Sequence, residues 1–311
     1  MARALQIAAD DAVFLSHKEL SFRQGNYSYT LERRDSKILY TVTDGIESMS
    51  LPLQYVFGVG SQTFVLQREG RFYESLVSYY PAIDGLDITV GDQQIRPKTL
   101  LEAMGRELRA DEYTACFGCH STGAVEGGRL NLDSLTLGVQ CEHCHVGADD
   151  HLAAISEGKL RSVPPKLSRL SPEDLSNFCG QCHRAWETVV RNHWMGEMNV
   201  RFQPYRLANS KCFDGSDPRL RCTGCHDPHQ EIVRDDETYS SKCLACHSER
   251  AKPSRGMLDE HPKYVTGMKS CPVSKDKCVS CHMPRVQLPG AHLTFTDHQI
   301  RVVHPNEAYP N

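Results

Sequence analysis

Residues 222–229 read CTGCHDPH, with two cysteines three positions apart, a histidine directly after the second, and another histidine three residues later. The same C-x-x-C-H pattern occurs six times, and every C-x-x-C in the chain is followed by histidine. The six are CFGCH (116–120), CEHCH (141–145), CGQCH (179–183), CTGCH (222–226), CLACH (243–247) and CVSCH (278–282). A pattern repeated without exception indicates one chemistry used six times.

That chemistry is the covalent attachment of haem c, for which C-x-x-C-H is the signature. Structural zinc needs four ligands and places no demand on the next residue, while a disulfide framework does not explain the invariable histidine. A thioredoxin-like redox motif would occur once. We therefore expect six haem c groups. The expected thioether residues are Cys116, Cys119, Cys141, Cys144, Cys179, Cys182, Cys222, Cys225, Cys243, Cys246, Cys278 and Cys281, and the expected proximal iron ligands are His120, His145, His183, His226, His247 and His282.

Nine further histidines are available for the second axial position. Bis-histidine coordination is favoured because histidine is abundant, whereas methionine, the other common partner, would raise the potential. Five candidates lie close to motifs or in helical or turn-like sequence: His151, His193, His229, His292 and His298. His261 and His17 compete for the sixth place, with His304 behind them. His143 is discounted because it lies inside a motif.

The histidine pair in CTGCHDPH carries geometric information. His226 and His229 are three positions apart, which is too short a link to pass around a porphyrin edge. His229 therefore cannot ligate the iron that His226 binds. As a ligand it would serve another haem, and two haems would lie nearly in contact.

The first 111 residues contain no cysteine and are rich in strand-forming patterns. YSYTLERR (27–34) and ILYTVT (38–43) alternate apolar and polar residues across an RDSK turn, and QTFVLQ (62–67) and RFYESLVSYY (71–80) flank an EG turn. A helix is expected at 97–108, with Pro97 at its first position. From about residue 112 the sequence breaks into short helical pieces and Gly- or Pro-rich turns, among them a Ser-capped helix in LSPEDLSNFCGQCH.

These patterns predict a multihaem cytochrome c fold. A small antiparallel β domain, residues 1–96, would precede a hexahaem domain, residues 97–311, that is α-rich, loop-rich and low in regular secondary structure. The motifs are irregularly spaced, which excludes simple tandem repeats.

Composition limits the partners and the compartment. The formal net charge of −4 and the lack of a long basic run argue against nucleic acid, and no apolar run approaches the roughly 18 residues of a membrane span. Haem c is attached outside the cytoplasm, so we expect a periplasmic or extracellular protein whose signal peptide is not in this numbering. Cys212 and Cys271 belong to no motif and are a candidate disulfide in such a compartment.

Several phrases resemble a family of exported multihaem cytochromes: RFQPYRLANSKCF (201–213), CTGCHDPHQ (222–230), CVSCHMPR (278–285) and HLTFTDHQI (292–300). The haem part is also similar to the lineage of multihaem nitrite reductases and hydroxylamine oxidoreductases. The resemblance implies paired haem stacking, with His151, His193, His229, His292 and His298 at positions where distal ligands occur. The resemblance therefore indicates the architecture of the protein more than its biological role.

Two functions follow from these expectations. The favoured one is electron transfer through six closely packed haems, as a conduit or as a subunit of a filament or complex, with redox proteins or copies of itself as partners. Haem propionates would add negative charge and suit a basic partner. The alternative is an oxidoreductase with one open haem that acts on a small nitrogen or sulfur compound. Against it, no C-x-x-C-K variant occurs, and Tyr205 and Tyr239 are not obvious haem crosslinks.

A His229→Ala substitution tests the reasoning about CTGCHDPH. We expect one haem to become high-spin while all six stay attached, measured by electron paramagnetic resonance (EPR) and intact mass. Loss of the haem bound at His226 alone would show the assignment to be wrong.

Overall fold

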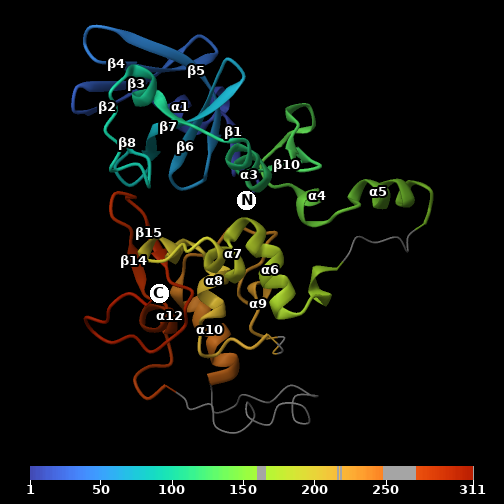
Figure 1. The fold of residues 1–311 in the computed structure, drawn as a ribbon. Helices are drawn as coiled ribbons and strands as arrows, with labels where there is room; N and C mark the ends of the chain where they lie inside the picture. The colour runs from blue at the N-terminus through green and yellow to red at the C-terminus, as the bar shows by residue number, and fades with distance from the viewer. Residues whose placement is uncertain (160–165, 216, 218, 248–270, 311) are drawn as a thin grey trace. The chain divides into compact units, whose positions relative to one another are not determined.

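The computed structural model describes residues 1–159, 166–215, 217, 219–247 and 271–310 (Figure 1). They form two compact units: unit 1 is Met1–Lys166 with Gln287–Leu293, and unit 2 is Leu167–Val286 with Thr294–Asn311. Motifs 116–120 and 141–145 lie in unit 1, and the other four lie in unit 2. The expected domain boundary between residues 96 and 97, which would separate the part without C-x-x-C-H motifs from the part that contains them, stays a prediction.

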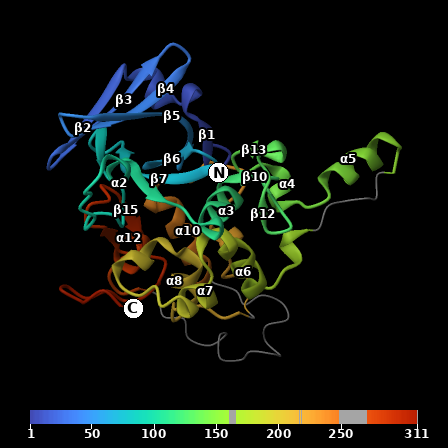
Figure 2. The ribbon, with the colours of Figure 1, turned by 45° about the horizontal axis from the view of Figure 1, so that its top comes forward.

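Unit 1 is built on an antiparallel nine-stranded sheet, drawn in blue to cyan in Figures 1 and 2. Seven strands follow one another in the order β2-β3-β4-β5-β6-β7-β8, while β1 pairs with β5 and β9 with β7. The strands are β1 (Leu5–Ile7), β2 (Glu19–Gln24), β3 (Tyr27–Arg34), β4 (Lys37–Thr43), β5 (Ser48–Phe57), β6 (Gln62–Arg68), β7 (Arg71–Tyr80), β8 (Gly85–Ile88) and β9 (Gly105–Glu107).

The expected fold class is wrong in two respects. The β part is not small, because the sheet is large and nearly barrel-shaped over residues 19–88. Helices make up only 33% of the described residues, so the fold is not a small β domain followed by an α-rich domain. Each C-x-x-C-H needs a single helical turn rather than a long helix, and strands such as β2 and β5 extend the sheet well beyond the two recognised hairpins.

The two predicted hairpins are confirmed. β3 and β4 pair up to Arg34 and Lys37, and β6 and β7 pair up to Arg68 and Arg71. Glu69 and Gly70 in the second turn have φ angles of 52° and 77°, the left-handed values that match the twist of the flanking strands.

Alternation along the strands builds the core of the sheet. Leu31 of β3 lies opposite Tyr40 of β4, and Tyr29 lies opposite Val42, and all four side chains are buried. Cross-strand pairs of aromatic and branched residues stabilise such a face. Each polar neighbour in sequence faces the other side.

The predicted helix at 97–108 is shorter than expected. α2 spans only Leu100–Met104, with Thr99 as its N-cap, and the chain then becomes strand β9. Gly105 pairs with Ser75 of β7 so closely that a β-carbon would collide with the carbonyl of Glu74. Arg106 forms ion pairs with Glu74 and Glu112, at 2.7 and 2.8 Å, which favour the extended form. Tertiary pairing therefore outweighs helix propensity here.

Short elements make up the rest of the described chain. In unit 1 they are η1 (Ala8–Asp10), α1 (Ala12–Ser16), α3 (Ala110–His120), β10 (Ser121–Thr122), β11 (Val125–Glu126), β12 (Arg129–Leu130), η2 (Leu132–Ser134), β13 (Thr136–Leu137), α4 (Cys141–Cys144) and α5 (Ala148–Ser156). In unit 2 they are η3 (Leu167–Arg169), α6 (Pro172–His183), α7 (Trp186–Arg191), η4 (Glu197–Arg201), α8 (Gln203–Ala208), α9 (Cys222–Cys225), α10 (Asp236–His247), α12 (Cys278–His282) and β15 (Thr294–Thr296), and β14 (Arg285–Gln287) pairs with β15. Helices α6, α7 and α8 lie side by side (Figure 2).

The Ser-capped helix in LSPEDLSNFCGQCH is confirmed as α6. The Ser171 hydroxyl accepts a hydrogen bond from the backbone N–H of Asp174, at 3.0 Å, and Pro172 occupies the first turn. Both features are typical helix starts. The helix runs directly into its motif and ends at His183.

A buried ion pair joins distant segments of unit 2. Arg206 of α8 donates two hydrogen bonds, each of 2.8 Å, to the carboxylate of Asp297, and both side chains have no exposed surface. Arg301 donates a further bond of 2.7 Å to Asp297. Removal of one partner from such a pair typically costs about 3–5 kcal/mol.

Within the described residues, no helix combines the length and the apolar character that a membrane crossing requires.

A Gly138→Ala substitution should destabilise unit 1. Gly138 has a φ of 69°, and a β-carbon there would collide with the backbone carbonyl of Ala2. Gly127 is the matched control because its φ of 55° is also positive, but a β-carbon added there would have no other atom within 4 Å. Thermal unfolding should show a loss of about 1–2 kcal/mol for Gly127→Ala and a larger loss for Gly138→Ala. Equal losses would show that the contact with Ala2 contributes nothing.

Candidate functional site

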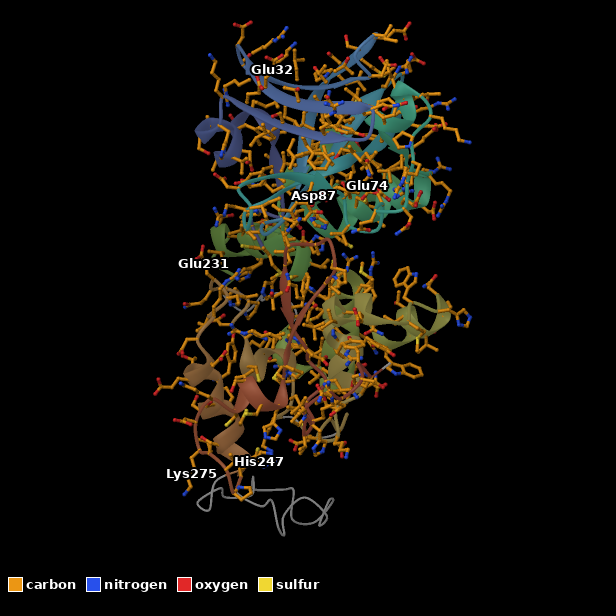
Figure 3. All side chains as sticks on the ribbon, turned by 90° about the vertical axis from the view of Figure 1, so that its left-hand side faces the viewer. Glu32, Glu74, Asp87, Glu231, His247 and Lys275 are labelled. Carbon is orange, nitrogen blue, oxygen red and sulfur yellow. The ribbon has the colours of Figure 1, made fainter. Side chains whose placement is uncertain are left out.

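All six C-x-x-C-H motifs lie on helical turns. Three close the longer helices α3, α6 and α10, and the other three coincide with the short helices α4, α9 and α12. Figure 3 shows His247 at the end of α10. Residues i and i+3 of a helix are neighbours on one face, so both sulfurs of a motif point to the same side, just ahead of its histidine. This arrangement suits attachment to one edge of a porphyrin.

The motif cysteines are not core residues. None of the twelve is fully buried: Cys141 and Cys281 are exposed, and the other ten are partly exposed. Structural cysteines are commonly among the most buried residues of a protein. Cysteines near the surface at a helix end are compatible with covalent attachment.

Three proximal histidines have the hydrogen bond that orients a metal-binding imidazole. Nδ1 of His120 lies 3.0 Å from the carbonyl of Ala4, and Nδ1 of His282 lies 2.8 Å from the carbonyl of Arg301. A carbonyl can only accept, so Nδ1 carries the proton and Nε2 keeps its lone pair. Such outer contacts fix the tautomer of metal ligands.

His226 is held in the same way by a tyrosine. The hydroxyl of Tyr239 lies 3.2 Å from Nδ1 of His226 and donates to the carbonyl of Val233, at 2.9 Å. The tyrosine oxygen therefore accepts from the imidazole. Burial lowers the pKa of His226 below its ordinary value, which favours the neutral ring that a metal needs. A hollow of about 270 Å³ adjoins this site, lined by Cys225, His226 and Tyr239 among others.

Motif cysteines meet in pairs within unit 2. A hydrogen bond from Cys179 lowers the pKa of the Cys222 thiol to about 7, so these two sulfurs from different motifs lie within hydrogen-bonding reach. Burial, together with the neighbouring Cys278, raises the pKa of Cys243 to about 11. In a haem-loaded protein these atoms would be thioether sulfurs. Motifs 179–183 and 222–226 are therefore adjacent, as are motifs 243–247 and 278–282.

The distal candidates of unit 2 differ in their surroundings. His298 lies with its ring centroid 6.1 Å from that of His226. His229 is on the surface, with 75% of its side chain exposed, in a turn closed by a bond of 2.9 Å from its backbone N–H to Asp227. His193 is exposed, two residues beyond the end of α7, with a φ of 53°. The structure therefore brings His298, rather than His229, to the CTGCH motif.

Two distal candidates of unit 1 are engaged with the sheet. Nε2 of His292 lies 2.6 Å from a carboxylate oxygen of Asp87 on β8, a residue labelled in Figure 3, and the ring of His292 packs edge-on against Tyr80. His17 contacts the carbonyl of Val13 through Nδ1 and Asp84 through Nε2, at 3.0 and 3.2 Å. Ligation by either histidine would require a different side-chain position.

The remaining candidates lie in other parts of the chain. His151 is partly buried on α5, the helix after α4, and His143 lies within α4 itself. His304 is exposed near the C-terminal end. His261 lies outside the described residues.

Cys212 and Cys271 are separate free thiols on the surface in the structure. Partial burial raises the pKa of the Cys212 thiol. The nearby thiols of Cys246 and Cys225 act in the same direction. The disulfide between Cys212 and Cys271 stays a prediction.

The sequence did not identify the residues that hold the candidate histidines in place. It suggested Tyr239 only as an unlikely covalent link to a haem, and it gave Arg206 and Asp297 no role. The available signal is that RFQPYR and FTDHQI, two phrases that carry the resemblance, hold one member of the pair each. Their separation of 91 positions hides the pair.

The residues present fit haem c. Paired sulfurs on one helix face and imidazoles oriented through Nδ1 are the donor set that covalent haem requires. In the described parts of the chain, no group of three or more His, Cys, Asp or Glu side chains is placed to hold a metal ion by itself.

Comparison with known proteins adds one finding. The family model described as Cytochrome c554 and c-prime matches residues 92–146, which include α3, α4 and the first two motifs. The match supports a c-type cytochrome. Haem c and electron transfer follow from it, whereas the number of haems and the wider lineage lie beyond the matched residues. No curated protein and no solved structure matches the chain.

A Tyr239→Phe substitution should raise the reduction potential of one haem in the loaded protein. Removal of the acceptor for Nδ1 of His226 makes the imidazole a weaker donor. One hydrogen bond of roughly 1 kcal/mol corresponds to about 40 mV for one electron. Potentiometric titration should show this shift with the haem content unchanged. Tyr113→Phe, in α3 of unit 1, is the control, and equal titrations for both variants would exclude the role of Tyr239.

Proposed function

We propose that the protein carries six covalent c-type haems and transfers electrons between partners outside the cytoplasm. The observation that carries the proposal is the pairing of motifs in unit 2. Cys179 lies next to Cys222, and Cys243 next to Cys278, so cofactors attached there would be neighbours. When bound, haem c supplies one-electron chemistry between ferric and ferrous iron.

The chain's own residues would bind and orient the cofactors. Each cysteine pair would hold one haem covalently, and the following histidine would provide a nitrogen ligand to its iron. The carbonyls of Ala4 and Arg301 and the hydroxyl of Tyr239 keep three of these nitrogens, in His120, His282 and His226, unprotonated at Nε2. Fixed ligands reduce rearrangement between redox states, which suits electron transfer.

Histidine on both faces of each iron would leave no position for a substrate. Nine histidines beyond the proximal six are enough for this, and His298 already lies beside a proximal ring. The net charge of −4, with the propionates added, favours a basic redox partner. We further propose a periplasmic or extracellular location, because haem c is attached there, and copies of the same chain as alternative partners in a filament or complex.

Intact mass and low-temperature EPR of the oxidised holoprotein test the proposal together. We expect a mass increase of six haems and only low-spin ferric signals. A mass increase of two haems would limit attachment to the motifs within residues 92–146. One high-spin component in the wild type would instead favour an oxidoreductase with an open haem acting on a small nitrogen or sulfur compound.

A further inference from the structure

The spacing of His226 and His298 matches that of two imidazoles on one iron. Each metal–nitrogen bond to histidine is about 2 Å, and with the distance from each nitrogen to its ring centre this gives roughly 6 Å between ring centroids. The observed distance is 6.1 Å, with the ring planes tilted by 37°. The two residues are 72 positions apart, so chain connectivity does not impose this spacing.

Both rings have the same nitrogen left for a metal. Nδ1 of His298 lies 3.0 Å from the carbonyl of Thr296, so it donates its proton there. Nδ1 of His226 donates to Tyr239. Each ring therefore keeps its lone pair on Nε2, the arrangement found in metal ligands.

The backbone around His298 is held on both sides. Ser210 donates to the carbonyl of His298 at 3.0 Å and accepts from the backbone N–H of Ile300 at 2.8 Å. On the other side, the buried carboxylate of Asp297 accepts from Arg206 and Arg301. His298 thus sits on a strongly anchored segment of unit 2.

We propose that His298 is the distal ligand of the haem attached at Cys222 and Cys225, opposite His226, and that Asp297 is its positioning residue. This inference rests on the proposed haem binding and adds the identity of one axial pair. It assigns His229 to another iron or to the surface.

A His298→Ala substitution in the holoprotein tests the ligand. We expect the mass to keep all haems while one low-spin EPR signal is replaced by a high-spin signal. Val302→Ala, at an exposed residue of the same segment, is the control and should leave the spectrum unchanged. An unchanged spectrum for His298→Ala would overturn the inference, whereas a wild type without these haems would overturn the proposed function instead.

A double substitution identifies the haem. Cys222→Ser with Cys225→Ser should lower the mass by one haem, and His298→Ala added to it should create no new high-spin signal. A new high-spin signal would show that His298 serves another iron.

Two further variants keep the test decisive if His298→Ala does not fold. His298→Met supplies another ligand and should raise the reduction potential of one haem, since methionine coordination raises it. Unchanged potentials would exclude His298 as a ligand.

Asp297→Asn should shift the g values of the same low-spin signal while the haem count stays constant. A lower melting temperature with unchanged g values would show that Asp297 only stabilises the fold.

Discussion

The buried ion pair between Arg206 and Asp297 is the interaction on which the part of unit 2 around His298 depends. It joins α8 to the segment after β15, and neither side chain has exposed surface. Burial alone would raise the pKa of Asp297, but hydrogen bonds from Arg206 and the backbone N–H of Gln299 keep it below its ordinary value. A charge pair of this kind is costly to break, because the remaining partner would be buried without compensation. The neighbouring residue in sequence is His298, so the pair also determines where that imidazole lies.

Hydrogen bonds at Nδ1 connect this framework to the chemistry. His120, His226, His282 and His298 donate through Nδ1 to an oxygen that belongs to a distant segment or to a neighbouring backbone. The shared result is an available lone pair on Nε2. The cysteine pairs on helical turns would attach the cofactors covalently. The core of the large sheet in unit 1 is formed by its own side chains.

Local signals predicted some elements well and others poorly. The hairpin at Glu69 and Gly70 and the capped helix at Ser171 were predictable because turn and cap chemistry involves only a few neighbouring residues. The helix at 97–108 was predicted too long, because the residues from Gly105 form β9 and pair with β7, a strand much earlier in the chain. The size of the sheet was underestimated because β2 and β5 were not recognised as strands, although both alternate in exposure, and their pairing with β3, β4 and β6 enlarges the sheet.

The sequence by itself determined the haem chemistry, because C-x-x-C-H places both sulfurs and one imidazole within five consecutive residues. It also showed that His229 cannot serve the iron of His226, a limit set by chain length alone. Only the tertiary structure decided which other histidine lies beside His226, since that depends on contacts between residues 72 positions apart. It likewise decided that His17 lies against Asp84 in the turn after β7 and His292 against Asp87 of β8, because no local pattern records which side chains folding brings together.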